Sequence, residues 1–252
     1  MNISPSTKMH LCIVIPCYNE EKGLAIQEYV HFVENNPTVL ICFVNDSSTD
    51  ATLEILEGLK NKYPEHVKVL SYKKNRGKAE AIRSGVHFCN ENYTFDYLAY
   101  LDADLATSLE ECAAMTSNFN NKITFVFGSR IRRIGAVIER SPFRFFAGRI
   151  IATIISHILK LNVYDTQCGC KVFTKTLAEE VFKKPFVSKW LFDVELFDRI
   201  IKFYGREVVL EKMLEVPLLR WVDRGDSKVK ATYFLKLWVD LYLINKICNS
   251  NN

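Results

Sequence analysis

Short apolar segments alternate with helical segments along the first half of this chain, and this alternation constrains the fold more than any other feature. The first two, Leu11–Pro16 and Val39–Val44, are continuously apolar and stop abruptly, as strands buried on both faces do. The apolar segments are Leu11–Pro16, Val39–Val44, Val67–Ser71, Tyr97–Leu101 and Ile123–Phe127. The helices that we expect between them end near Glu34, span Ala51–Lys62 and Ala79–Cys89, and run from a Ser108 cap to about Phe119. We therefore predict an α/β fold with a mainly parallel sheet and helices on both faces.

Polar clusters follow these predicted strands at their carboxyl ends, where ligands bind in open parallel sheets. The clusters are Asn19 with Glu20, Asp46, Arg76–Lys78, and Asp102 with Asp104. Residues i and i+2 of an extended segment point to the same side, so Asp102 and Asp104 can face one ligand together. Two carboxylates suit a hard divalent ion, and a diphosphate could complete its coordination. The sequence thus predicts a metal and nucleotide site at this edge of the sheet.

Composition narrows the class of protein further. With 252 residues, one α/β domain is the default expectation, and a net charge of +4 gives no case for nucleic acid. Eight scattered cysteines without a CxxC pair fit reduced, buried thiols. The first ten residues contain no apolar signal region, and no stretch reaches about 18 uninterrupted apolar residues. We expect a cytoplasmic protein, with any membrane contact peripheral and on the cytoplasmic face.

The phosphate-binding loops of other nucleotide folds are missing from the sequence. No GxGxxG follows the first predicted strand, and GxxxxGK[ST] does not occur. A dinucleotide oxidoreductase is therefore not expected. A bound nucleotide would be held through its base, its ribose and a metal-bridged diphosphate.

The strand-end clusters, taken in order and spacing, resemble the signatures of glycosyltransferase family 2. The matching segments are Ile13–Glu21, Val44–Asp50, Asn75–Lys78, Leu101–Asp104, Gly128–Arg130, Tyr164–Lys171, Phe192–Glu195, and Trp221 with Ser227 and Lys228. The resemblance covers about residues 11–230, and the Asp165–Lys171 segment points to the polyprenyl-phosphate sugar transferases, especially those resembling dolichyl-phosphate β-glucosyltransferase. It implies a GT-A fold, Rossmann-like, and transfer of a hexose, glucose above all, from a UDP-sugar with inversion at the anomeric carbon.

The resemblance also implies roles for single residues. Those assigned to the nucleotide sugar are Pro16, Asn19, Glu20, Asp46, Lys78, Asp102, Ala103 and Asp104. Asp46 is expected at the base or ribose, and Asp102 and Asp104 are expected to hold Mg²⁺ or Mn²⁺. Outside this context each has an ordinary explanation, such as a turn residue for Asp46 or a solvated lysine for Lys78. The chain departs from the family at Asn45, where an aspartate is usual, and at Ala106, where some relatives carry glutamine.

The second half of the chain carries the features expected of an acceptor site. Six arginines and one acid, Glu139, lie among apolar residues between positions 130 and 149, and arginine suits forked contacts with phosphate. The residues assigned to the acceptor are Arg130, Arg140, Arg144, Gln167, Ser227 and Lys228, of which Arg130 and Arg144 match phosphate-binding positions of relatives. An anionic head on an apolar tail, such as a polyprenyl phosphate, fits this composition.

Two apolar segments could contact a membrane or a partner. The stretch 143–161 is interrupted by arginines, so it reads either as a helix at a membrane surface or as a core helix. The stretch 233–247 is a second candidate, within an amphipathic C-terminal helix expected at 231–248. A homo-oligomer interface is an equal alternative. We expect one GT-A domain over 1–252, with a nucleotide-sugar half at about 11–128 and an acceptor half at about 129–230.

The mechanism depends on the acceptor. A phosphate monoester is ionised near neutral pH and can attack without a general base, with Arg130 and Arg144 at the reacting phosphate. A sugar hydroxyl in polysaccharide synthesis needs a base, and Asp193 is then the candidate, with Glu195 as second choice. Asp193 could instead cap the N-terminus of a helix that begins after Trp190. A nucleotide-binding protein without turnover is the remaining alternative, which the paired aspartates disfavour.

Overall fold

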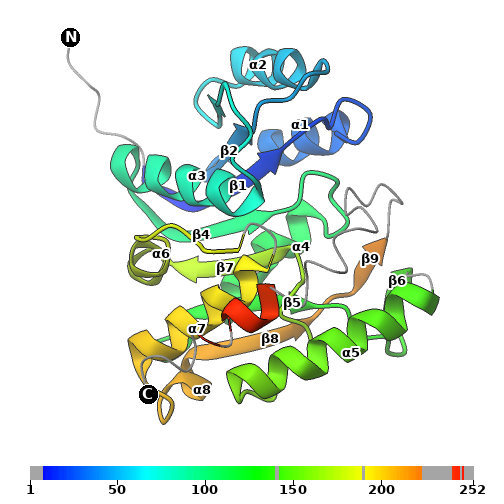
Figure 1. The fold of residues 1–252 in the computed structure, drawn as a ribbon. Helices are drawn as coiled ribbons and strands as arrows, with labels where there is room; N and C mark the ends of the chain where they lie inside the picture. Colours follow the sequence, from blue (N-terminus) through cyan, green and yellow to red (C-terminus); the bar gives the residue numbers. More distant parts are fainter. Residues whose placement is uncertain (1–7, 140–141, 189–190, 223–239, 245, 247–252) are drawn as a thin grey trace.

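The computed structural model describes residues 8–139, 142–188, 191–222, 240–244 and 246, and its centre is a mainly parallel sheet (Figure 1). In this part of the chain seven strands pair in the order β3-β2-β1-β4-β7-β5-β8. They are β1 (Met9–Cys17), β2 (Val39–Asn45), β3 (Val67–Ser71), β4 (Phe95–Leu101), β5 (Phe125–Ser129), β7 (Cys170–Thr174) and β8 (Met213–Pro217). The five predicted strands are confirmed, and β7 is the antiparallel exception, between β4 and β5.

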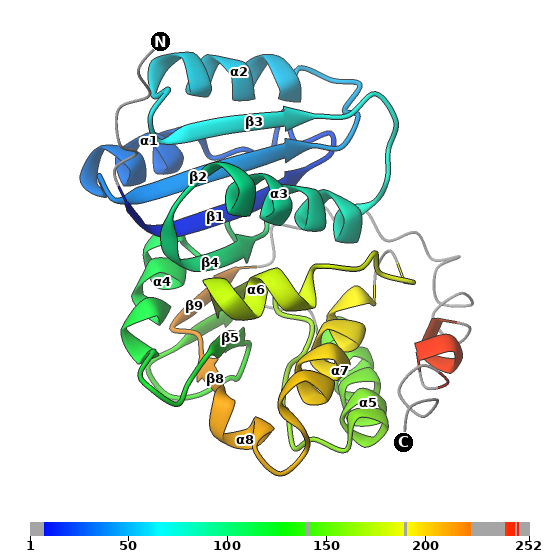
Figure 2. The same cartoon turned by 90° about the vertical axis from the view of Figure 1, so that its left-hand side faces the viewer.

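Helices cover both faces of the sheet, as the alternation predicted (Figures 1 and 2). One face packs against α1 (Ile26–Asn35), α2 (Thr52–Lys62) and α4 (Leu109–Ala114). The other packs against α3 (Lys78–Asn92), α5 (Pro142–Leu159), α6 (Lys175–Val181) and α7 (Phe192–Tyr204). Because both faces are covered, the interior positions of β1 and β2 are almost entirely apolar and buried. A 3₁₀ turn (Met115–Asn118) and α8 (Val209–Lys212) are two further, short helical elements.

The helix starts follow from local chemistry. Ser108 Oγ accepts the Glu111 amide at 3.1 Å, so the predicted cap of α4 is confirmed. Asp50 Oδ1 accepts the Thr52 amide at 3.1 Å at the start of α2. The loop after β2 therefore supplies a polar side chain to the start of the next helix.

The sheet has one point where its winding reverses, and it lies between β1 and β4. Strands β1, β2 and β3 extend the sheet in one direction, and β4 then returns to the other side of β1. In open α/β sheets the carboxyl ends of such neighbouring strands form the ligand crevice. Here β1 leads into Asn19 and Glu20, and β4 leads into Asp102 and Asp104.

The second half adds smaller features around this sheet. Strands β6 (Val137–Glu139) and β9 (Arg220–Val222) form a two-stranded parallel sheet. On α5, Ile155 and Leu159 are buried whereas Phe146 and Ile150 are exposed, so the end of this helix packs in the core, and membrane contact at its start stays a prediction. No helix in the described residues is long and apolar enough to span a bilayer. Of the predicted C-terminal helix, residues 240–244 and 246 are described and helical, and Leu241 and Ile244 are buried. The division into donor and acceptor halves stays a prediction.

Candidate active site

The paired aspartates lie directly after β4 and share their surroundings with Lys78. The Lys78 ammonium contacts Asp102 Oδ1 at 2.5 Å, and both side chains are partly exposed. Burial alone would lower the pKa of Lys78, but the Asp102 and Asp193 carboxylates outweigh burial and raise it. Asp104 Oδ1 accepts the Ala106 amide at 3.0 Å, which makes a tight turn. Leu105 in that turn is buried and has φ +51°, a conformation that costs a leucine free energy and is concentrated at functional sites.

The loops after β1 and β2 are tied together beside this cluster. Asn19 Oδ1 accepts the Thr49 amide at 2.8 Å, and the Glu20 amide donates to Thr52 Oγ1 at 2.8 Å. Asn19 adopts φ +53°, which asparagine tolerates better than most residues. These bonds fix the β1 loop, with Pro16 at the strand end, against the start of α2. Asn19 and Glu20, both predicted to bind the nucleotide, are therefore held in place by residues that follow β2.

Asp46 has an internal role that the sequence alone did not predict. Its side chain is buried, and its two oxygens accept the amides of Arg76 at 2.8 Å and Gly77 at 2.7 Å. Gly77 has φ +90°, which suits glycine, and α3 begins at the next residue, Lys78. Asp46 thus positions the loop that presents Lys78. Contact between Asp46 and a base or ribose stays a prediction.

The two departures from the family pattern fit this arrangement. Asn45 is buried, donates to Ser71 Oγ at 3.0 Å and accepts the Ser48 amide at 3.2 Å, so the amide orders the loop after β2. Ala106 contributes only its backbone amide to Asp104. The described residues contain no group of three or more His, Cys, Asp or Glu side chains arranged to hold a metal. A divalent ion at Asp102 and Asp104 would therefore depend on diphosphate and water oxygens for its other ligands.

A buried ion pair lies next to the paired aspartates. Lys171 on β7 has a completely buried side chain, and its ammonium lies 2.8 Å from Asp193 Oδ1. The Tyr100 hydroxyl donates to the same oxygen. Asp193, at the start of α7, is therefore committed to two internal donors. Glu195, the second choice as a base, contacts Arg199 at 2.7 Å and accepts the Val187 amide at 2.8 Å.

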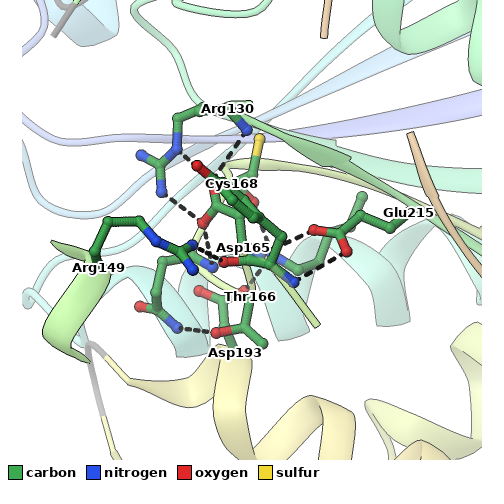
Figure 3. A network of polar contacts seen from close by, with 10 residues as sticks. Arg130, Arg149, Asp165, Thr166, Cys168, Asp193 and Glu215 are labelled. Carbon is green, nitrogen blue, oxygen red and sulfur yellow. Dashed lines mark hydrogen bonds and ion pairs between the residues drawn. The ribbon is translucent and has the colours of Figure 1, made fainter. Parts of the chain in front are cut away.

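Arg130, predicted at the acceptor phosphate, forms a forked pair with Asp165 (Figure 3). Its Nε and Nη2 atoms lie 2.6 Å and 2.8 Å from the two Asp165 oxygens, and both side chains are largely buried. Burial would raise the pKa of Asp165, but the Arg130 guanidinium outweighs it and lowers the pKa to about 2. Glu215 accepts the amides of Tyr164 and Asp165 at 3.0 Å and 2.9 Å, which fixes the backbone beneath the pair.

The remaining acceptor residues are placed less completely. Gln167 lies two residues after Asp165, and its backbone amide donates to Asp165 Oδ1 at 3.1 Å. Arg144 belongs to the first turns of α5. Arg140, Ser227 and Lys228 lie outside the described residues. The sequence did not predict Lys171 as the partner of Asp193, or Glu215 as the acceptor of the Tyr164 and Asp165 amides. The one signal for either residue is a single charge within an otherwise apolar strand segment.

Comparison with known proteins now identifies the family. The sequence profile of "Glycosyl transferase family 2" matches residues 12–182. A dolichyl-phosphate beta-glucosyltransferase of Trichomonas vaginalis is 33% identical over 96% of this chain and 72% of that protein. Its counterpart in Drosophila melanogaster is 30% identical over 96% of this chain and 76% of that protein, and the Homo sapiens protein is 28% identical over 94% and 80%.

Solved structures agree on the fold. Mannosyl-3-phosphoglycerate synthase from Rubrobacter xylanophilus superposes with a TM-score of 0.69 at 16% identity. The match covers 97% of this chain and 76% of that protein. Glucosyl-3-phosphoglycerate synthase from Mycobacterium tuberculosis, solved with Mn²⁺, UDP and glucosyl-3-phosphoglycerate, has a TM-score of 0.66 at 12% identity, with 95% and 80% covered. At these identities the likeness concerns the fold alone, and it confirms the predicted GT-A architecture. The chain belongs to glycosyl transferase family 2.

Proposed function

We propose that this enzyme transfers glucose from UDP-glucose to a polyprenyl phosphate, with inversion at the anomeric carbon. The observation that carries the proposal is the cluster of Asp102, Asp104 and Lys78 at the point where the sheet reverses, in a chain that resembles dolichyl-phosphate beta-glucosyltransferases along 96% of its length. A diphosphate donor needs both a cation-binding acid pair and a fixed positive charge. The cluster supplies both.

In this proposal the donor diphosphate lies against the strand-end cluster. Asp102 and Asp104 would hold Mg²⁺ or Mn²⁺, since both ions prefer carboxylate oxygens, and a bound ion would supply positive charge to stabilise the departing UDP. Lys78 adds a cation fixed by Asp102. Pro16 ends β1, Asn19 and Glu20 follow it, and Ala103 follows β4, the strand paired with β1, so we assign these four residues to the nucleotide sugar as well.

On the acceptor side the proposal needs no general base. A phosphate monoester has a second pKa near 6, so one of its oxygens can attack C1 directly while the bond from C1 to UDP breaks. A hydroxyl acceptor would need Asp193 as base, yet Lys171 and Tyr100 occupy Asp193 Oδ1. The geometry thus favours the phosphate. We assign its recognition to Arg144 and to Arg130, whose Nη1 lies outside the pair with Asp165, together with Arg140, Gln167, Ser227 and Lys228.

Formation of a glycolipid tests this function. The purified protein is incubated with labelled UDP-glucose, Mn²⁺ or Mg²⁺, and a polyprenyl phosphate in detergent, and organic-phase label is counted. We expect label to accumulate with the divalent ion and to fall to background with excess EDTA. Absence of glycolipid with every common nucleotide sugar would contradict the proposal.

We further propose that the enzyme meets its lipid acceptor at a membrane surface. Ile134 is fully exposed, and Phe146 and Ile150 of α5 are also exposed. The guanidinium of Arg132 lies 5.2 Å from the centroid of Phe145, which brings the loop with Ile134 beside the start of α5. Arg132 and Arg133, which precede Ile134, are exposed, and their positive charge favours an anionic bilayer. In the described chain the seven cysteines are free and buried, which supports a site facing the cytoplasm.

Replacing the exposed isoleucine tests this membrane surface. Ile134→Asp removes an apolar contact worth about 1.5–3 kcal/mol when buried, so we expect about tenfold weaker binding to vesicles of phosphatidylcholine and phosphatidylserine. Leu210→Asp is the matched control, because Leu210 is also apolar and exposed but belongs to α8, beyond the other end of α5 (Figure 1). Equal vesicle binding by the two variants in a sedimentation assay would contradict the assignment.

A further inference from the structure

Gly169 lies against the carboxylate of Asp102, across the antiparallel pair of β4 and β7. Leu101 is opposite Cys170 in this pair, and the Asp102 amide donates to the Gly169 carbonyl at 3.2 Å. Asp102 is thus the first residue beyond β4, and Gly169 is its neighbour just before β7. The backbone of one metal-ligand candidate is bonded directly to this glycine.

The contact leaves no room for a side chain at position 169. A Cβ built on Gly169 would lie 2.0 Å from Asp102 Oδ2 and 2.4 Å from Asp102 Cγ. Gly169 is not among the residues with positive φ, so the backbone itself does not require glycine there. Contact with the Asp102 side chain is therefore the reason that glycine is needed.

Lys171 fixes the segment that contains Gly169. Its buried ammonium donates to the Cys168 carbonyl at 2.7 Å and pairs with Asp193 at 2.8 Å. Cys168 and Cys170, on either side of Gly169, are completely buried in the core. The segment cannot move away from Asp102 without exposing these thiols or breaking the bonds of Lys171. The segment is therefore a fixed surface against which the Asp102 carboxylate packs.

We propose that Gly169 is a positioning residue that sets the orientation of the Asp102 carboxylate toward the donor diphosphate and its metal ion. One face of the carboxylate packs against the Gly169 Cα, and Lys78 contacts its Oδ1 on another side. Together these two contacts restrict the orientation of the carboxylate. This inference rests on the proposed role of Asp102 as a metal ligand.

Gly169→Ala tests the inference, with Gly58→Ala as the matched control. Gly58 lies within α2, and a Cβ there meets nothing within 4 Å. We expect Gly169→Ala to raise the Mn²⁺ concentration that half-saturates UDP binding by about 10–100-fold, as loss of a residue that orients a metal ligand does. Isothermal titration of UDP at several Mn²⁺ concentrations measures this shift. An unchanged Mn²⁺ requirement in Gly169→Ala would overturn the proposal.

A second measurement separates steric contact from general damage. If the contact with Asp102 is the cause, Gly169→Ala lowers the melting temperature of the chain, and adding Asp102→Ala restores most of the loss. If the double variant is as unstable as Gly169→Ala, or also fails to fold, the contact is not the cause and the proposal is wrong. Metal-independent UDP binding by the unmodified protein would instead refute the proposed function, whatever position 169 does.

Discussion

Replacing Asp104 by asparagine is expected to lower kcat/KM for glucose transfer about 100-fold or more, with little change in stability. The amide keeps the shape of the carboxylate and its bond to the Ala106 amide, but it loses the charge that binds the divalent ion. Removal of one preorganised electrostatic contact to a developing charge costs about 2.7–4 kcal/mol of transition-state stabilisation. Initial rates at saturating Mn²⁺ measure the effect.

Asp96→Asn is the control for this prediction. Asp96 lies on the same strand, β4, near its other end, and forms an exposed pair with Lys8. We expect wild-type rates from Asp96→Asn, because exposed pairs contribute little. An Asp104→Asn variant as active as Asp96→Asn would remove the acid pair from the mechanism.

Replacing Asp165 by asparagine is expected to destabilise the protein by about 2–5 kcal/mol near pH 7. The pKa of Asp165 falls from 3.8 to about 2 in the folded chain, which corresponds to about 2 kcal/mol. Leaving one partner of a buried pair unmatched can cost about 3–5 kcal/mol. Arg130 would be that partner, because its side chain is 13% exposed. Urea unfolding at several pH values measures the difference.

The stability difference between wild type and Asp165→Asn should depend on pH in a defined direction. Because the folded pKa of Asp165 is depressed, its stabilising contribution is fully present above about pH 4 and is lost as the pH falls toward 2. Wild type and Asp165→Asn should therefore converge over that range. Glu57→Gln is the control, since the Glu57–Lys60 pair is exposed, and we expect about 0.5 kcal/mol or less from it. A gap for Asp165→Asn that stays constant from pH 7 to about pH 2 would contradict the assigned pair.

This pair also affects how acceptor variants are interpreted. Arg130→Ala would remove a proposed phosphate contact and at the same time leave Asp165 buried without its cation. Loss of activity in that variant cannot separate recognition from folding. The same holds for Asp193→Asn, which would leave the buried Lys171 ammonium without its carboxylate. Variants at these two positions therefore require a stability measurement beside the rate.

The strands and the donor cluster could be predicted because their signals are local. Apolar runs such as Leu11–Pro16 and Val39–Val44 stop at polar residues, and the parallel arrangement brings those residues to one edge. The proximity of Lys78 and Asp102 follows from that rule, although the two residues are distant in sequence. Periodicity therefore predicted the fold, and strand-end position predicted which residues of the candidate donor site lie close together.

The pairing of charged residues in the second half could not be predicted in this way. Arg130 meets Asp165 because β7 inserts antiparallel between β4 and β5, and no repeat in the sequence indicates that insertion. A lysine such as Lys171 is unexpected in a buried apolar strand, and only its ion pair with Asp193, distant in sequence, explains it. The interpretation of Asp193 as a base came from its residue type, whereas its role in the fold depends on neighbours distant in sequence.

A comparison of two lipid acceptors tests the central claim most directly. A polyprenyl phosphate and the corresponding polyprenol differ only in the headgroup, so initial rates with UDP-glucose and Mn²⁺ isolate the nature of the nucleophile. We predict glycolipid from the phosphate alone, with a rate nearly constant above about pH 7, because the phosphate is already ionised there and no base is needed. Transfer to the polyprenol or to a sugar hydroxyl, with none to the phosphate, would contradict the account.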